Sequence, residues 1–147
     1  MKLKAILLAT LALSPLAQAN TDIMTHHAYA RATPPTAATS AVFAEIVNNS
    51  KEDRFIVSAR TDAAGKVELH DVIKEGDVMK MRQIERIKVP ASKTTILKPG
   101  SLHIMLFELK KPLVEGEKIE VEIAFANGEK QTFNAPIKKV MSGMKHN

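Results

Sequence analysis

Histidine and methionine side chains recur at strand spacing in two hydrophobic segments of the sequence. His103 and Met105 are two residues apart, and so are Met79 and Met81. Successive side chains of a β-strand point to opposite faces, so the members of each pair share one face. Their Cα atoms then lie about 6.5–7 Å apart along the strand, which lets both side chains reach one metal ion.

A second histidine, His70, follows Val67 and Leu69 in another short hydrophobic segment. The alternation of a strand turns Val67 and Leu69 toward the core and leaves His70 on the more polar face. The pattern therefore predicts two imidazoles and two or three thioethers on the exposed faces of neighbouring strands.

Imidazole beside thioether is a donor set that suits a soft metal. Cu(I) accepts both donors, whereas Zn(II) rarely takes methionine, and Mg(II) and Ca(II) prefer oxygen. The sequence contains no cysteine, which excludes thiolate sites, and a thioether site also survives in an oxidising compartment. Methionine is equally common as a gap-filler in cores, so the residues alone support metal binding and packing about equally.

The spacing of four of these residues resembles a known family. The periplasmic copper chaperones called PCu(A)C carry the motif H(M)-X10-M-X21-H-X-M. In this sequence ten residues separate His70 from Met81, twenty-one separate Met81 from His103, and one separates His103 from Met105. The flanking segments from Ala30 to Pro35, around Lys98-Pro99-Gly100 and around Lys111-Pro112-Leu113 are similar too. One departure is Asp71, at the position of the optional methionine.

This resemblance implies a cupredoxin-like antiparallel β-sandwich of Greek-key type that binds one Cu(I) ion. The implied ligands are His70, Met81, His103 and Met105, with Met79 as an auxiliary donor. The family further implies copper delivery to the binuclear centre of cytochrome c oxidase, in its subunit II, alongside Sco-type thioredoxin-like copper proteins. Periplasmic copper storage or tolerance is the alternative function, because it needs the same site.

The hydrophobic pattern of the chain has period two, interrupted by turn residues, and no sustained helical period follows the N-terminal segment. Many short strands at regular spacing are typical of an antiparallel sandwich or barrel. Gly-containing connections predict hairpin turns at Lys74–Asp77 and at Asn127-Gly128. The expected strands are Ala41–Val47, Phe55–Val57, Val67–His70, Val78–Ile84, Thr94–Leu97, Leu102–Leu109, Ile119–Ala126 and Thr132–Val140.

The first 19 residues resemble a cleavable secretory signal peptide. Met1–Lys4 carries two lysines, Ala5–Leu13 is apolar, and Ala17-Gln18-Ala19 is a small-residue cleavage signal. A membrane anchor is the alternative, but the run is far shorter than the ~20 apolar residues of a spanning helix. We expect a periplasmic copper-binding domain at 20–140, without a membrane span and without a lipidated N-terminal cysteine, and a flexible tail at 141–147.

The overall charge of +5 is modest and spread along the chain. No basic block with interleaved aromatic residues is present, so nucleic acid is not expected as a partner. No catalytic triad, carboxylate pair or phosphate loop stands out. Copper oxygenases that use an N-terminal histidine need it as the first mature residue, but cleavage after Ala19 would leave Asn20 there. We therefore expect a monomeric binding protein and not an enzyme.

Two further groups of histidine and methionine lie near the ends of the domain. Solvated termini carry such residues incidentally, so copper binding and no function are alternatives for both groups. In the tail they form a candidate second, weaker site that could also take Cu(II). The N-terminal group is Met24, His26 and His27, and the tail group is Met141, Met144 and His146.

Two carboxylates, Glu68 and Asp71, flank His70. They are expected to be solvated charges at the edge of the strand. The alternative is that one of them accepts a hydrogen bond from an imidazole and orients it.

Overall fold

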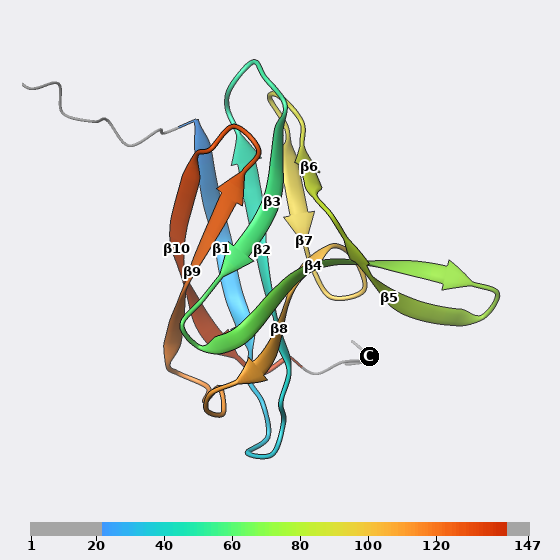
Figure 1. The fold of residues 1–147 in the computed structure, drawn as a ribbon, viewed down its shortest axis with the longest axis vertical. Coiled ribbons are helices and arrows are strands. Elements are labelled where there is room, and N and C mark those ends of the chain that lie inside the picture. Colours follow the sequence, from blue (N-terminus) through green and yellow to red (C-terminus); the bar gives the residue numbers. More distant parts are fainter. Residues whose placement is uncertain (1–21, 141–147) are drawn as a thin grey trace, which may run out of the picture.

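The computed structural model describes residues 22–140, which contain ten strands and no helix (Figure 1). The predicted all-β class is confirmed. Consequently no helix long and apolar enough to cross a membrane is present in that range. The strands are β1 (Ile23–Arg31), β2 (Ser40–Asn48), β3 (Arg54–Arg60), β4 (Ala64–Glu75), β5 (Val78–Ile84), β6 (Ile87–Val89), β7 (Thr94–Leu97), β8 (His103–Leu109), β9 (Lys118–Phe125) and β10 (Lys130–Lys138).

The strands pair in the order β5-β4-β8-β2-β1-β10-β9-β3-β6, and β7 pairs with β2 beside β8. This continuous sheet folds over on itself, with β1, β2, β4 and β8 in one layer and β3, β6 and β9 in the other (Figure 1). The predicted cupredoxin-like sandwich is thereby confirmed. Among the pairings of residues 22–140, β1 with β10 is parallel and the others are antiparallel.

The core lies between the two layers and contains one face of most strands, but not of the exposed β5. In β9, Ile119, Val121 and Ile123 are buried and alternate with more exposed residues, as its period-two pattern predicts. In β8, Ile104 and Leu106 are completely buried in this core. His103 and Met105 alternate with them, so these candidate ligands point to the outer face of the layer.

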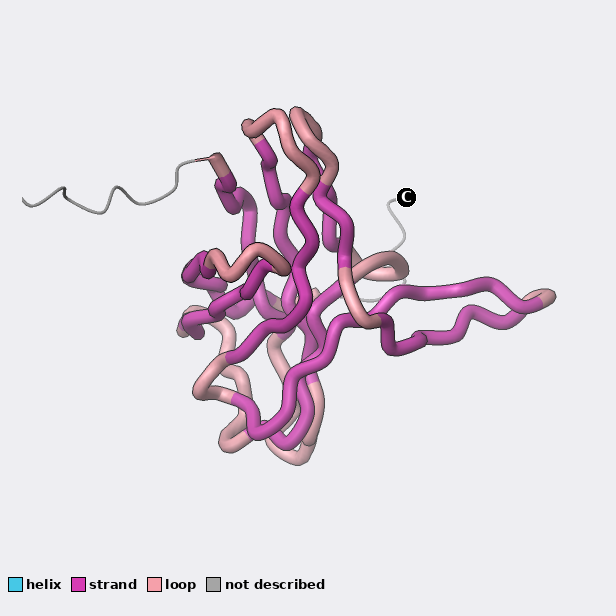
Figure 2. Tube along the Cα trace, turned by 45° about the horizontal axis from the view of Figure 1, so that its top comes forward, coloured by secondary structure: helices cyan, strands magenta, loops and turns pink. Residues whose placement is uncertain are grey.

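The hairpin of β4 and β5 extends beyond the sandwich (Figure 2). Its turn is formed by Gly76 and Asp77, and Gly76 adopts a φ of 61°, which a glycine accepts without strain. Beyond Asp71 the hairpin has one neighbour fewer, because β8 pairs with β4 only as far as His70. Strand β5 is consequently exposed along almost its whole length.

Two sequence-based expectations about strand limits were wrong. No strand was expected before Ala41, but β1 begins at Ile23, whose side chain is buried in the core. The strand expected at Val67–His70 is longer, since Ala64 and Gly65 also belong to β4. Gly65 lies against the Glu108 side chain of the neighbouring strand, and a Cβ at Gly65 would be about 3.1 Å from it.

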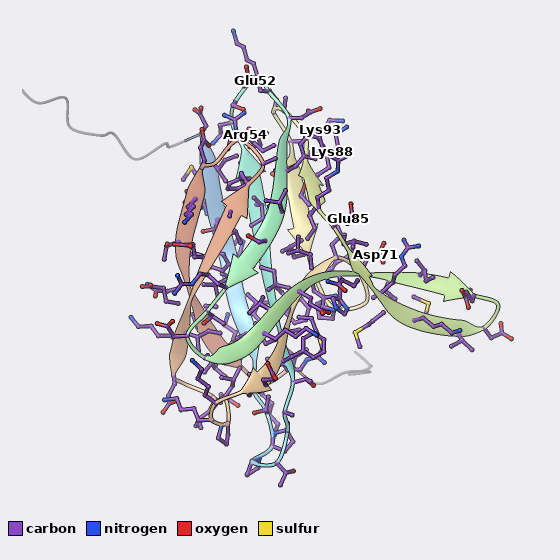
Figure 3. All side chains as sticks on the ribbon, viewed as in Figure 1. Glu52, Arg54, Asp71, Glu85, Lys88 and Lys93 are labelled. Carbon is purple, nitrogen blue, oxygen red and sulfur yellow. The ribbon has the colours of Figure 1, made fainter. Side chains whose placement is uncertain are left out.

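One end of the sandwich is held by a buried arginine. Arg54 is 8% exposed, and its guanidinium lies within 4 Å of carboxylates from three segments: Asp22, Glu52 and Glu129. Figure 3 shows Glu52 and Arg54 at this end and Asp71 near the base of the hairpin. This charge cluster is therefore well separated from the candidate site.

Candidate metal centre

The two candidate histidines are direct partners across adjacent strands. His70 of β4 and His103 of β8 occupy the same register position, and their ring centroids are 5.6 Å apart. Side chains at paired positions lie on the same face of a sheet. The antiparallel pairing of β4 with β8 thus brings together two residues that are 33 positions apart in the sequence.

The His70 ring is oriented by a carboxylate. Its Nε2 lies 2.8 Å from Oε2 of Glu68, and both side chains are nearly buried. Because the carboxylate is an acceptor, Nε2 carries the proton and donates it. The other nitrogen, Nδ1, is buried without a hydrogen-bond partner in the protein. A buried nitrogen lone pair without a partner is costly, and a metal ion would satisfy it.

His103 is fixed by a different acceptor. Its Nδ1 lies 2.8 Å from the carbonyl oxygen of Ser101, so Nδ1–H donates and Nε2 keeps its lone pair. Burial lowers the pKa of the His103 imidazole below its ordinary value of 6.5, and the Ser101 carbonyl opposes this effect. His103 is therefore neutral at pH 7, which is the state that ligates a metal.

Met105 lies on the same face as the two histidines. It is two residues after His103, it pairs with Glu68 of β4 and Ala41 of β2, and it is half-buried. Met105 therefore lies two residues along the sheet from the histidine pair, and it lines one hollow together with His103.

The remaining methionines come from the hairpin. Met79 and Met81 are 57% and 59% exposed, and both line a hollow of about 270 Å³ together with His103 and Met105. Met81 pairs with Val72, two residues from His70, whereas Met79 pairs with Lys74. Along the strands Met81 is thus about 7 Å from the level of His70 and Met79 about twice as far. This order supports Met81 as the nearer donor.

Aromatic rings cover the histidines on both sides. Phe43 of β2 lies with its ring centroid 6.2 Å from that of His103, and Phe107 of β8 lies 5.8 Å from His70. The expectation that both histidines lie on exposed faces was wrong, since His70 is 8% and His103 4% exposed. The cover by Phe107 could have been predicted, because Phe107 continues the alternation of His103 and Met105 along one strand. The cover by Phe43 could not, because it depends on how β2 pairs with β8.

The two carboxylates beside His70 have different partners. Glu68 contacts His70 and also Nζ of Lys66 at 3.2 Å, and the hydrogen bond from His70 lowers the pKa of the Glu68 carboxyl. Asp71 instead forms a bidentate pair with Arg82 of β5, at 2.7 and 3.2 Å. Glu68 therefore orients an imidazole, while Asp71 joins the two strands of the hairpin.

Of the other candidate donors, the N-terminal group lies on β1 and not on a free terminus. Met24, His26 and His27 are all exposed there. The tail donors Met141, Met144 and His146 lie outside the described residues. So do residues 1–19.

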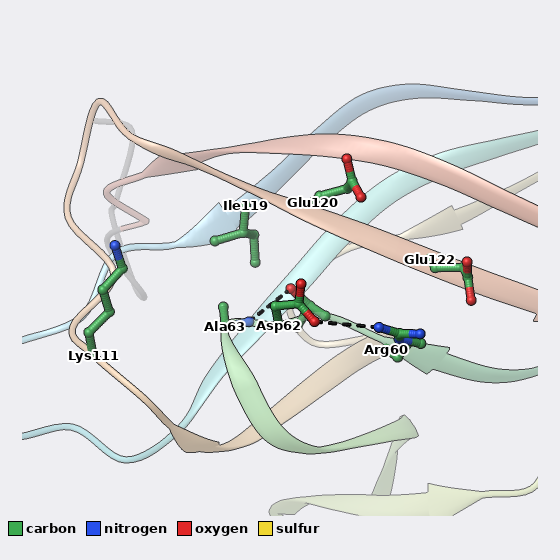
Figure 4. A pocket seen from close by; sticks show the side chains of 8 residues that line it. Arg60, Asp62, Ala63, Lys111, Ile119, Glu120 and Glu122 are labelled. Atoms are coloured by element: carbon green, nitrogen blue, oxygen red, sulfur yellow. Dashed lines mark hydrogen bonds and ion pairs between the residues drawn. The ribbon is translucent and has the colours of Figure 1, made fainter.

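A separate hollow of about 310 Å³ lies beside β9 and the β3–β4 turn (Figure 4). Its lining is charged with both signs and includes Arg60, Asp62, Lys111 and Glu120, with Arg60 and Asp62 forming an ion pair at 3.4 Å. No histidine or methionine lines it, so it does not provide the soft donors that the chain gathers elsewhere.

The chemistry of the donors in the main cluster is that of a soft-metal site. The imidazoles of His70 and His103 and the thioethers of Met105 and Met81 lie on one side of the sheet. Within residues 22–140, no three His, Asp or Glu side chains are already gathered around one point. The cluster therefore lacks the set of oxygen and nitrogen donors that Ca(II), Mg(II) or structural Zn(II) would select, and its donors fit Cu(I).

One family model and two curated proteins match the sequence. The sequence matches the LpqE-like family ("Putative lipoprotein LpqE-like") over residues 23–137. It is 32% identical over 100 residues to the protein Lxx21020 of Leifsonia xyli subsp. xyli and 25% identical over 99 residues to the uncharacterized protein RP573 of Rickettsia prowazekii. Each alignment covers 67% of this chain but only 60% and 55% of the respective relatives.

Solved structures with the same fold are copper-binding domains. The solution structure of Cu(I)-bound DR1885 from Deinococcus radiodurans superimposes with a TM-score of 0.67 at 27% identity, covering 85% of this chain and 83% of that one. The copper-bound PCuAC domain from PmoF2 gives a TM-score of 0.69 at 17% identity, covering 81% and 94%. These matches confirm the resemblance to PCu(A)C domains that the motif predicted.

Proposed function

The chain belongs to the LpqE-like family, and from this premise we propose that it is a periplasmic Cu(I)-binding metallochaperone. The proposed ligands are His70, Met81, His103 and Met105, with Met79 as an auxiliary donor. The observation that carries the proposal is the direct pairing of His70 with His103, each with one nitrogen tied to an acceptor and the other left for a metal.

The charge of the site favours the monovalent ion. Two neutral imidazoles and two thioethers leave a net charge of +1 with Cu(I) and +2 with Cu(II). A buried charge is costly unless it is paired, so the partly buried donors favour the smaller charge. The carboxylate of Glu68, which contacts His70, adds one negative charge that offsets the charge of the ion, although Glu68 is not one of the proposed ligands.

Uneven exposure of the ligands suits transfer of the ion. His70 and His103 are held in the sheet, whereas Met81 lies on the exposed hairpin. An acceptor could displace the Met81 thioether first while the imidazoles retain the ion. The exposed hairpin edge is thus the proposed point of contact with the acceptor, for which the family resemblance suggests subunit II of cytochrome c oxidase, with Sco-type proteins alongside.

Storage of copper is the alternative, since it would use the same four ligands. Mixing Cu(I)-loaded protein with apo subunit II tests delivery directly. We expect copper to move to the subunit, and the Met81→Leu variant to alter the rate of transfer. Retention of the ion by the wild-type protein, with tight binding, would favour storage.

The proposed periplasmic location rests on the first 19 residues, which resemble a signal peptide. The proposed monomeric state rests on the sequence analysis alone. The structures of Cu(I)-bound DR1885 and of the copper-bound PCuAC domain from PmoF2 support a binding role. Detection of the chain in the periplasmic fraction, without residues 1–19, is the experiment that tests the location.

A further inference from the structure

Strand β1 contains a bulge at two adjacent histidines. His26 pairs with Glu45 and Tyr29 pairs with Phe43, so three steps along β1 match two steps along β2. One extra residue in a strand is the definition of a β-bulge. His27, within the bulge, has a φ of 54°, a left-handed conformation that is uncommon for residues other than glycine.

The bulge places both histidines on the same side of the sheet. In a regular strand, adjacent side chains would point to opposite faces. Here His26 shares a face with its partner Glu45, and His27 Nδ1 contacts the Glu45 carboxylate directly. Both imidazoles are exposed, and their ring centroids are 6.3 Å apart.

We propose that His26, His27 and Glu45 form a second metal site that takes Cu(II). Two imidazole nitrogens and one carboxylate oxygen are donors for a borderline divalent ion, and Cu(II) binds such donors more tightly than Zn(II) does. The one nearby thioether among residues 22–140, that of Met24, accepts a contact from the side-chain amide of Asn49 at 3.7 Å, so the donors of the proposed site are imidazole and carboxylate, which do not favour Cu(I). His27 and Glu45 are already in contact, and the exposed His26 ring must turn toward them to complete the site.

The second site is separate from the main cluster but lies on the same face. Ala41, which pairs with Met105, and Glu45 both belong to β2 and are four residues apart, or about 13 Å along the strand. No ligand is shared between the two clusters. The proposal therefore does not depend on the proposed Cu(I) function.

Titration of the full-length protein with Cu(II) in air tests the proposal. Cu(II) is paramagnetic, so the first equivalent should broaden the amide NMR signals of residues 25–29 and 44–46. Electron paramagnetic resonance should show coupling to imidazole nitrogen. The variants His26→Asn and His27→Asn should each weaken this Cu(II) equivalent at least tenfold, and Glu45→Gln should weaken it as well.

Two controls keep the test decisive. His146→Asn should leave the same amide signals broadened, because the tail does not contribute to this site. Cu(I) affinity should be unchanged in the His26→Asn and His27→Asn variants, which also shows that they fold. First broadening at residues 103–105 or at His146, unchanged Cu(II) affinity in both histidine variants, or tighter binding of Zn(II) than Cu(II) would each overturn the proposal.

Discussion

Glu68 and His70 are joined by a hydrogen bond of 2.8 Å that leaves the buried Nδ1 of His70 without a partner. The carboxylate selects the tautomer of His70 and fixes the direction of its free lone pair. Hydrogen-bonded acceptors behind metal-binding histidines commonly act in this way. In the proposed site the role of Glu68 is therefore to position His70 and not to bind the metal itself.

Replacing Glu68 by glutamine should lower Cu(I) affinity by about 10–100-fold, since acceptors behind ligating histidines contribute on that scale. Competition with a chromophoric Cu(I) chelator measures the affinity. The Nε2–H tautomer of His70 in the wild-type apoprotein should be visible by ¹⁵N NMR and less populated in the variant. Glu120→Gln, on the exposed face of β9, is the matched control and should change neither quantity. An unaltered tautomer in Glu68→Gln would contradict the positioning role.

The two hairpin methionines should differ in importance. Met81→Leu removes a thioether at the level of Val72 and should weaken Cu(I) binding more than Met79→Leu, whose position lies further along the hairpin. Both side chains are exposed, so the free energy of unfolding of both variants should lie within about 0.5 kcal/mol of that of the wild type. A larger loss of affinity in Met79→Leu would show that the ligand in this segment is Met79.

The apoprotein should lose stability as the pH falls below about 6.5. Burial holds the pKa of His103 in the folded protein below its ordinary value, so the unfolded chain binds protons first. The contribution of His103 is complete above pH 6.5 and declines as the pH falls toward the lowered pKa. Denaturant unfolding between pH 7.5 and pH 5 should show this slope, and His103→Gln should reduce it. An equal slope in the variant would contradict the assignment.

Copper affinity should follow the protonation of the histidines. Protons compete with Cu(I) for imidazole and not for thioether, so affinity should be constant above pH 6.5 and fall below about pH 6. The lowered pKa of His103 delays the onset for that ligand. Chelator competition across this range measures the effect. Affinity that stays flat from pH 7 to pH 4.5 would mean that imidazoles are not ligands.

Removal of residues 141–147 should leave the tight Cu(I) site intact. The tail carries Met141, Met144 and His146, which we predict to hold a second, weaker copper equivalent. If the tail is flexible, as its sequence predicts, binding must order it at a cost in conformational entropy, so its affinity should be lower than that of the strand site. Calorimetric titration of the full-length and truncated proteins gives the number of copper ions bound per chain. The same number for both proteins would show that the tail binds no copper.

Local patterns predicted much of the fold. The limits of β5 and β7 agree with the sequence because alternating or β-branched residues are bounded there by glycine and proline turns. Strand β1 was missed, since the bulge at His26 and His27 interrupts its alternation. A period-two pattern assumes a regular strand, and an inserted residue removes the signal.

The site was predictable in part for a related reason. The spacing assigned His103 and Met105 to one face, which the structure reproduces, but it could not reveal that the face is covered. The cover comes from Phe43 on a neighbouring strand, and that neighbour follows from long-range pairing. The partner of His70 could have been predicted, since alternation along β4 places Glu68 on the face of His70 and Asp71 on the opposite face, where Asp71 pairs with Arg82.

X-ray absorption at the copper edge of the Cu(I)-loaded protein tests the central claim most directly. Shells of both nitrogen and sulfur scatterers are predicted, from two imidazoles and two thioethers around one ion. His103→Ala should reduce the nitrogen shell, and Met105→Leu should reduce the sulfur shell. A first shell without sulfur, or a spectrum that neither substitution alters, would contradict the assignment of His70, Met81, His103 and Met105 as the copper ligands.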